Sequence, residues 1–196
     1  MLFISISAFT FGQKIVKTSG DAKLAFLKGQ KAINIEYNYS EMGVGKYKTE
    51  ESYLEEKSAE RNEKEAGSGD KWKEGWVTSR DRVYHPKFEE LFNKGLASKG
   101  ITGARGMEDT EYTLIVKTTF TEPGFNIGIT KKPASINVEY IFVETENHDN
   151  VLAKFVQNGV PGAQAMGMDY DTSTRISESY AKAGKMLAGY IAKQLK

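Results

Sequence analysis

The chain has 196 residues, with 27 Lys and Arg against 26 Asp and Glu, so its formal net charge is +1. This length predicts one domain, and 39% hydrophobic with 27% charged residues argues against both wholesale disorder and an integral membrane fold. The near-neutral charge gives no global attraction to nucleic acid or anionic lipid. Because there are no cysteines, disulfides, thiol nucleophiles and cysteine metal sites are excluded.

The first segment, residues 2–11, is apolar and uncharged, and the first charge comes at Lys14. It is shorter than the roughly 20 residues needed to cross a bilayer. Its pattern is typical of a secretory signal, so we predict a signal peptide at 1–12 and an exported mature chain, 13–196, in the periplasm or at the outer envelope. A basic residue before the apolar run is missing, and the alternation at 4–7 also fits an N-terminal strand.

The first clear strand lies at residues 33–39, where apolar and polar residues alternate. A charged helical insertion of about residues 48–99 follows. Its first part, 49–66, is rich in helix-forming residues but has few apolar ones, so we expect it to lie largely in water. A second helix begins near residues 68–70, and Pro86 predicts a helix start or a kink within it.

After the insertion, a period of two residues returns at 112–120, and apolar residues predict two further strands at 136–143 and 151–156. The connections are short, which favours antiparallel hairpins. Glycines and a proline between 159 and 167 predict a loop, and apolar residues at helical spacing over 176–191 predict an amphipathic terminal helix. The fold class is therefore α+β: a mostly antiparallel sheet of about four or five strands, covered by the C-terminal helix and interrupted by the helical insertion.

This element order, with the sequence 143–146 before 151–153 and the helix 175–195, resembles a group of exported envelope proteins of Gram-negative bacteria. Their domain is similar to the N-terminal domain of the translocation protein TolB and to the periplasmic domain of the curli-secretion lipoprotein. The resemblance implies export and an envelope location, and it brings no catalytic motif. The chain departs from the group in lacking a lipid-anchoring cysteine and in carrying the helical insertion.

Few residues carry recognisable chemistry. His85 precedes a proline at a predicted helix start, which favours capping or surface exposure, and His148 falls in a polar turn where we expect solvation rather than a metal. Asp169, Asp171 and Ser173 imitate the start of a calcium loop, but its sixth and twelfth positions lack the required glycine and glutamate. We therefore predict no catalytic, cofactor-binding or metal-binding residue, and expect Asp171 or the residue after it to cap the terminal helix.

Trp72 and Trp76 are the first of two candidate interaction sites. With basic neighbours they could form a platform for stacking on a base or a sugar ring. Their spacing of four residues is equally typical of the packing face of a helix, which is the simpler interpretation.

Phe125, Ile127 and Ile129 are the second candidate site. They alternate with uncharged residues between two predicted strands. If this stretch extends a hairpin beyond the sheet, its apolar side could dock a partner chain or another copy of the protein. The alternative is a strand end packed on the helical insertion.

These observations predict an exported, non-enzymatic envelope protein that acts through protein–protein contacts or self-association, without cofactor, nucleic acid or transmembrane span. The alternative is a carbohydrate-active hydrolase or a carbohydrate-binding module that uses acidic residues with Trp72 and Trp76. A carrier of a small ligand would need a closed apolar pocket, which the sequence cannot reveal.

Overall fold

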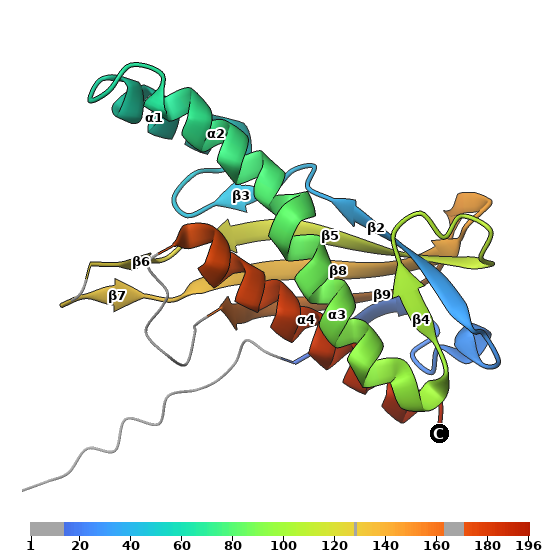
Figure 1. The fold of residues 1–196 in the computed structure, drawn as a ribbon. Coiled ribbons are helices and arrows are strands. Elements are labelled where there is room, and N and C mark those ends of the chain that lie inside the picture. The colour runs from blue at the N-terminus through green and yellow to red at the C-terminus, as the bar shows by residue number, and fades with distance from the viewer. Residues whose placement is uncertain (1–13, 128, 163–170) are drawn as a thin grey trace, which may run out of the picture.

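A seven-stranded sheet forms the layer on which the rest of the chain packs (Figure 1). The computed structural model describes residues 14–127, 129–162 and 171–196, so the predicted signal peptide at 1–12 lies outside the described residues. The strands are β1 (Val16–Gly20), β2 (Ala32–Asn38), β3 (Gly43–Val44), β4 (Thr102–Ala104), β5 (Tyr112–Glu122), β8 (Ala134–Glu144) and β9 (Asn147–Gly162). β6 (Phe125–Asn126) and β7 (Lys131–Lys132) form a separate two-stranded sheet.

The strand order is β1-β9-β8-β5-β2-β4, with β3 also paired to β5. The long central strands β5, β8 and β9 are antiparallel neighbours, as their short connections predicted. β2 instead runs parallel to both β5 and β4, because the helical segment between β3 and β4 carries the chain back across the sheet. Burial alternates along β8, so one face of the sheet is covered and the other is less so.

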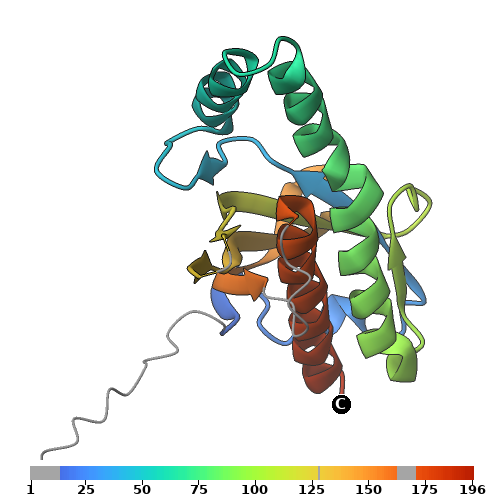
Figure 2. The ribbon, with the colours of Figure 1, turned by 60° about the vertical axis from the view of Figure 1, so that its left-hand side comes forward.

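Helices cover one face of this sheet, as Figures 1 and 2 show from two directions. The helices are α1 (Glu50–Asn62), α2 (Ser68–Ser79), α3 (His85–Leu96) and α4 (Thr172–Gln194), with short helical turns at η1 (Ala25–Leu27), η2 (Arg80–Tyr84) and η3 (Ala97–Lys99). α3 and α4 pack side by side, and α4 also contacts β8 and β9. No helix among the described residues is long and apolar enough to cross a membrane.

The helical insertion divides into an outer arm and an inner layer. α1 buries only Leu54 and lies largely in water, as its sequence predicted. α3 instead buries Phe88, Phe92 and Leu96 against the sheet and α4. The insertion therefore supplies half of the helical layer as well as a projecting arm made of α1 and α2 (Figure 1).

A π-helical turn, η2, joins α2 to α3 immediately before Pro86. The amide of His85 reaches back five residues to the carbonyl of Arg80. Pro86 has no amide hydrogen, and its ring clashes with the preceding turn of a regular helix, so a wider turn relieves both problems. Of the two outcomes that the sequence predicted for Pro86, the structure shows a helix start within a continuous helical run.

The predicted α+β fold class is confirmed, with two differences in detail. The sheet has seven strands instead of four or five, because β1, β3 and β4 are too short to show a period of two residues. The predicted loop at 159–167 was wrong over its first residues, since β9 continues to Gly162. Pro161 is tolerated there because β1 pairs with β9 only at 153–156, so the far edge of β9 is open at Pro161.

Candidate functional site

A small hairpin projects from the sheet where β5 and β8 are connected, and we call residues 125–127 and 129–132 the tip hairpin (Figure 1). Phe125 pairs with Lys132, and Asn126 pairs with Lys131. Gly124 precedes it with φ +62°, and a Cβ on that glycine would lie 2.4 Å from the carbonyl oxygen of Lys132. Only glycine fits this close approach, which sets the angle at which the hairpin leaves the sheet.

The base of the tip hairpin is held by Arg175, in the first turn of α4. Arg175 is only 2% exposed, which is unusual for an arginine. The guanidinium donates hydrogen bonds to the carbonyl oxygens of Pro123 and Gly124 and, over 2.9 Å, to the hydroxyl of Thr172. The hairpin is thus fixed to the terminal helix as well as to the sheet.

The apolar side chains of the tip hairpin face solvent. Phe125 is 42% exposed, Ile127 68% and Ile129 98%. The alternative interpretation was a strand end packed on the helical insertion. In the described part of the chain these three side chains are exposed instead. Scattered exposed apolar residues are normal, whereas three on one small hairpin form a patch that typically marks an interaction surface.

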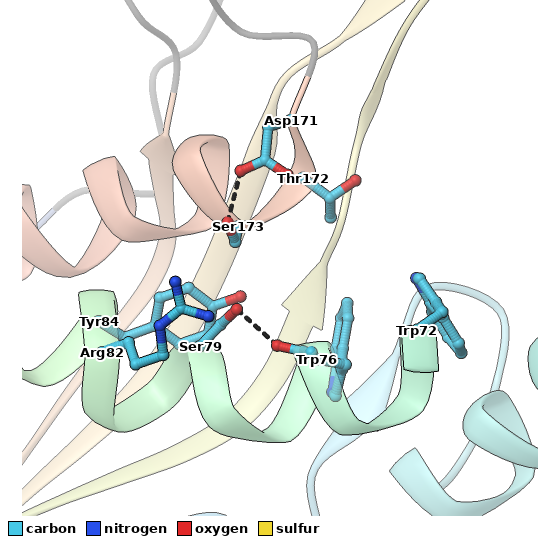
Figure 3. A pocket seen from close by; sticks show the side chains of 9 residues that line it. Trp72, Trp76, Ser79, Arg82, Tyr84, Asp171, Thr172 and Ser173 are labelled. Atoms are coloured by element: carbon cyan, nitrogen blue, oxygen red, sulfur yellow. Dashed lines mark hydrogen bonds between the residues drawn. The ribbon is translucent and has the colours of Figure 1, made fainter. Parts of the chain in front are cut away.

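Trp72 and Trp76 line a pocket of about 270 Å³ between α2 and the first turn of α4 (Figure 3). Figure 3 shows the two indoles at one end, Arg82 and Tyr84 at the other, and the start of α4 facing them. Asp171 is the one acidic residue among the described residues that line this pocket. It caps α4, as predicted, by accepting a 2.8 Å hydrogen bond from the amide of Thr174.

The indoles themselves are mostly engaged in packing. Trp76 is 7% exposed, and its ring nitrogen donates a 2.6 Å hydrogen bond to Glu50. Trp72 is partly buried, with Tyr53 against it and the guanidinium of Arg61 5.1 Å from its ring centroid. These contacts agree with the simpler interpretation, a packing face between α1 and α2, and leave little of either ring free to stack on a sugar.

A polar cluster around His85 was missed in the sequence. His85 is 6% exposed, so the expectation of surface exposure was wrong. Its Nε2 lies 2.9 Å from the hydroxyl of Tyr39, and its Nδ1 lies 3.1 Å from both an Asp81 carboxylate oxygen and an Arg105 guanidinium nitrogen. Pro86 inside a helical pattern was the available signal for the π turn next to this ring.

Burial and the positive charge of Arg105 lower the pKa of His85 to about 4, against the partial compensation of Asp81. The imidazole is therefore neutral at neutral pH. A shallow pocket of about 340 Å³ lies next to it, lined also by Tyr37, Glu36 and Glu108. Among the described residues, no group of three or more His, Asp or Glu is placed to hold a metal ion.

His148 lies at the start of β9 instead of in a loop, and its Nε2 is 3.6 Å from Glu36. The ring is 44% exposed. The structure thus brings neither histidine close to the tip hairpin or the tryptophans, and Asp169 of the failed calcium motif lies outside the described residues.

Comparisons with known proteins give a distant similarity. No family model and no curated protein sequence matches the chain. The PelC dodecamer from Paraburkholderia phytofirmans is 10% identical, with 86% of this chain and 96% of that chain covered at a TM-score of 0.38. A single-residue variant of that dodecamer is 12% identical, with 87% and 96% covered at 0.37. The resemblance to TolB is not confirmed.

Proposed function

We propose that the protein is an exported, non-enzymatic protein of the bacterial envelope that binds another protein chain through the tip hairpin. The observation that carries the proposal is the exposure of three large apolar side chains on a hairpin whose base is hydrogen-bonded to Arg175 of α4. Full burial of each such side chain is worth about 1.5–3 kcal/mol. A partner that covers these three side chains therefore gains several kcal/mol from the burial of apolar surface.

The absence of a catalytic motif in the sequence is the reason to propose binding rather than chemistry. Export rests on the apolar segment at residues 2–11, whose pattern is that of a signal. Cell fractionation tests this part: the account expects a shortened chain in the envelope fraction, and an uncleaved chain in the cytoplasm would contradict it.

The binding proposal is tested by Ile127→Asp, with Val151→Asp as its matched control. Both positions are exposed, Ile127 at 68% and Val151 at 44%, and they lie on different hairpins. In gently lysed cells we expect the native complex to be larger than a monomer, and to collapse to monomer size in Ile127→Asp only. An unchanged complex in a folded Ile127→Asp protein would overturn the proposal.

A second candidate, carbohydrate binding, is favoured by one observation: Trp72, Arg82 and Asp171 border the same pocket. An aromatic face with a cation and a carboxylate is a combination that can hold a sugar ring. The packing of both indoles argues against it. Calorimetric titration with soluble oligosaccharides tests this candidate function. Carbohydrate binding requires a heat of binding with the unmodified chain and none with the Trp72→Ala variant.

A further inference from the structure

The outer face of α2 carries a shallow hollow. It is separate from the pocket lined by Trp72 and Trp76 and from the polar cluster around His85. It has a volume of about 390 Å³ and is lined by Asp70, Lys73, Glu74, Val77 and Thr78. Val77 is the one large aliphatic residue among them, and it is 42% exposed on the projecting arm. We call these five residues the α2 hollow.

The tip hairpin and the α2 hollow are complementary in polarity. Each presents aliphatic surface, Ile127 and Ile129 on the hairpin and Val77 in the hollow. Burying aliphatic surface on both sides removes it from water. The two surfaces are therefore compatible in polarity.

The two surfaces are also complementary in charge. Lys131 forms no ion pair with any residue in the described part of the chain, whereas Lys132 is paired with Glu122. In the α2 hollow, neither Asp70 nor Glu74 has an ion-pair partner among the described residues. The positive charge of Lys73 cancels one of these two negative charges, so the hollow has a net charge of −1. Lys131, the unpaired cation on the hairpin, is thus matched by one net negative charge beside Val77. This match favours a docking orientation in which Lys131 faces the acidic residues of the hollow.

The two surfaces belong to separate projections of the same molecule. In both Figure 1 and Figure 2, β6 and β7 leave the sheet end while α2 rises with the helical arm. The hairpin is fixed by Arg175, and the arm is fixed by the Glu50–Arg80 ion pair. Because the two surfaces lie on different projections, a second copy is the partner that brings them together.

We infer that the tip hairpin of one copy docks on the α2 hollow of a second copy, with Ile127 and Ile129 against Val77 and Lys131 facing Glu74. This inference rests on the proposed function, since it names the partner of the tip hairpin. Because the contact joins two different surfaces, it closes as a reciprocal pair or continues as a ring or filament.

A charge-swap experiment on the purified mature chain tests this contact. Lys131→Glu and Glu74→Lys each replace an attraction by a repulsion, so we expect each to weaken self-association roughly three- to tenfold, measured by analytical ultracentrifugation. The double variant, Lys131→Glu with Glu74→Lys, restores the attraction and the association. Both positions are exposed and form no ion pair within the described chain, so the fold is not at risk.

The control is Glu146→Lys, an exposed acid at the opposite end of β8, which should leave association unchanged. Val77→Asp provides an independent check, because a carboxylate in the hollow should abolish the contact. A monomer at every concentration, or a double variant that fails to recover, would overturn the inference.

Other binding partners of the tip hairpin would give different results in these experiments. If the purified chain is monomeric while Ile127→Asp still dissolves a complex in cells, the partner is a different protein, and the proposed function survives without the second copy. If the chain binds vesicles of anionic phospholipid and does not self-associate, both the inference and the protein-contact proposal fail.

Discussion

The imidazole ring of His85 stacks on the phenol ring of Tyr37, with ring centroids 3.7 Å apart and an angle of 12° between the planes. The same Tyr37 donates a hydrogen bond of 3.3 Å to the backbone carbonyl of His85. This pair joins the sheet to the π turn at the root of the helical arm, so the protonation of one buried ring affects how the arm is attached.

The stability of the protein should fall as the pH falls from about 6.5 to about 4. Burial and Arg105 depress the pKa of His85 in the folded state to about 4, below the value near 6.5 expected in the unfolded chain. Between these values the unfolded chain binds more protons, which favours unfolding as the solution is acidified. The full effect amounts to about 3 kcal/mol, present above pH 6.5 and lost toward pH 4.

Urea unfolding followed by tryptophan fluorescence at a series of pH values measures this dependence. His85→Gln should flatten the curve between pH 4 and 6.5, because it removes the ring whose pKa is depressed in the folded state. An equally steep curve in His85→Gln would show that another group titrates.

Loss of the Glu50 charge should loosen the helical arm. Glu50 accepts hydrogen bonds from both Trp76 and Arg80, and the side chains of Glu50 and Arg80 are each 17% exposed. Glu50→Gln leaves the Arg80 charge uncompensated, so we expect a loss of about 2 kcal/mol in the free energy of unfolding. The surface pair of Lys57 and Glu60 is the comparison, and Glu60→Gln should cost less than about 0.5 kcal/mol.

Two glycines of α4 should respond oppositely to alanine. A Cβ on Gly184 would lie 2.3 Å from the carbonyl oxygen of Phe88, at a close contact between α3 and α4. Gly184→Ala must therefore separate the helices, and we expect a loss of about 1–3 kcal/mol. Nothing lies within 4 Å of a Cβ on Gly189, so Gly189→Ala should stabilise the helix by about 0.5–1 kcal/mol.

Thermal unfolding of the two variants and the unmodified chain compares them directly. The α3–α4 packing account requires a lower melting temperature for Gly184→Ala and a higher one for Gly189→Ala. Equal shifts in the same direction would contradict it.

The sequence predicted those parts of the fold whose hydrophobic period extends over several residues. Alternation placed a strand at 33–39, where β2 lies at Ala32–Asn38, and the helical stripe placed α4. Asp171 was recognised as a cap because an acid before a helical run has a specific local role. In each case a local signal and the tertiary structure agree.

The sequence did not predict what depends on contacts between distant segments. Arg175 is buried because the carbonyl oxygens at the base of the tip hairpin approach it, and nothing in its neighbours indicates that. His85 is buried against Tyr37 of β2 and against Tyr39 just after this strand, and both lie more than forty residues earlier in the chain. Gly162 ends β9 against α4, where a Cβ would lie 2.0 Å from the carbonyl oxygen of Arg175.

The central claim, that the tip hairpin contacts another protein chain, is tested most directly by site-specific photocrosslinking in living cells. A photoreactive amino acid at Ile129, 98% exposed at the hairpin end, is compared with the same group at Val151, 44% exposed on β9. The account predicts a discrete adduct from position 129, identified by mass spectrometry, and none from position 151. No adduct from position 129, or the same adducts from both positions, would contradict it.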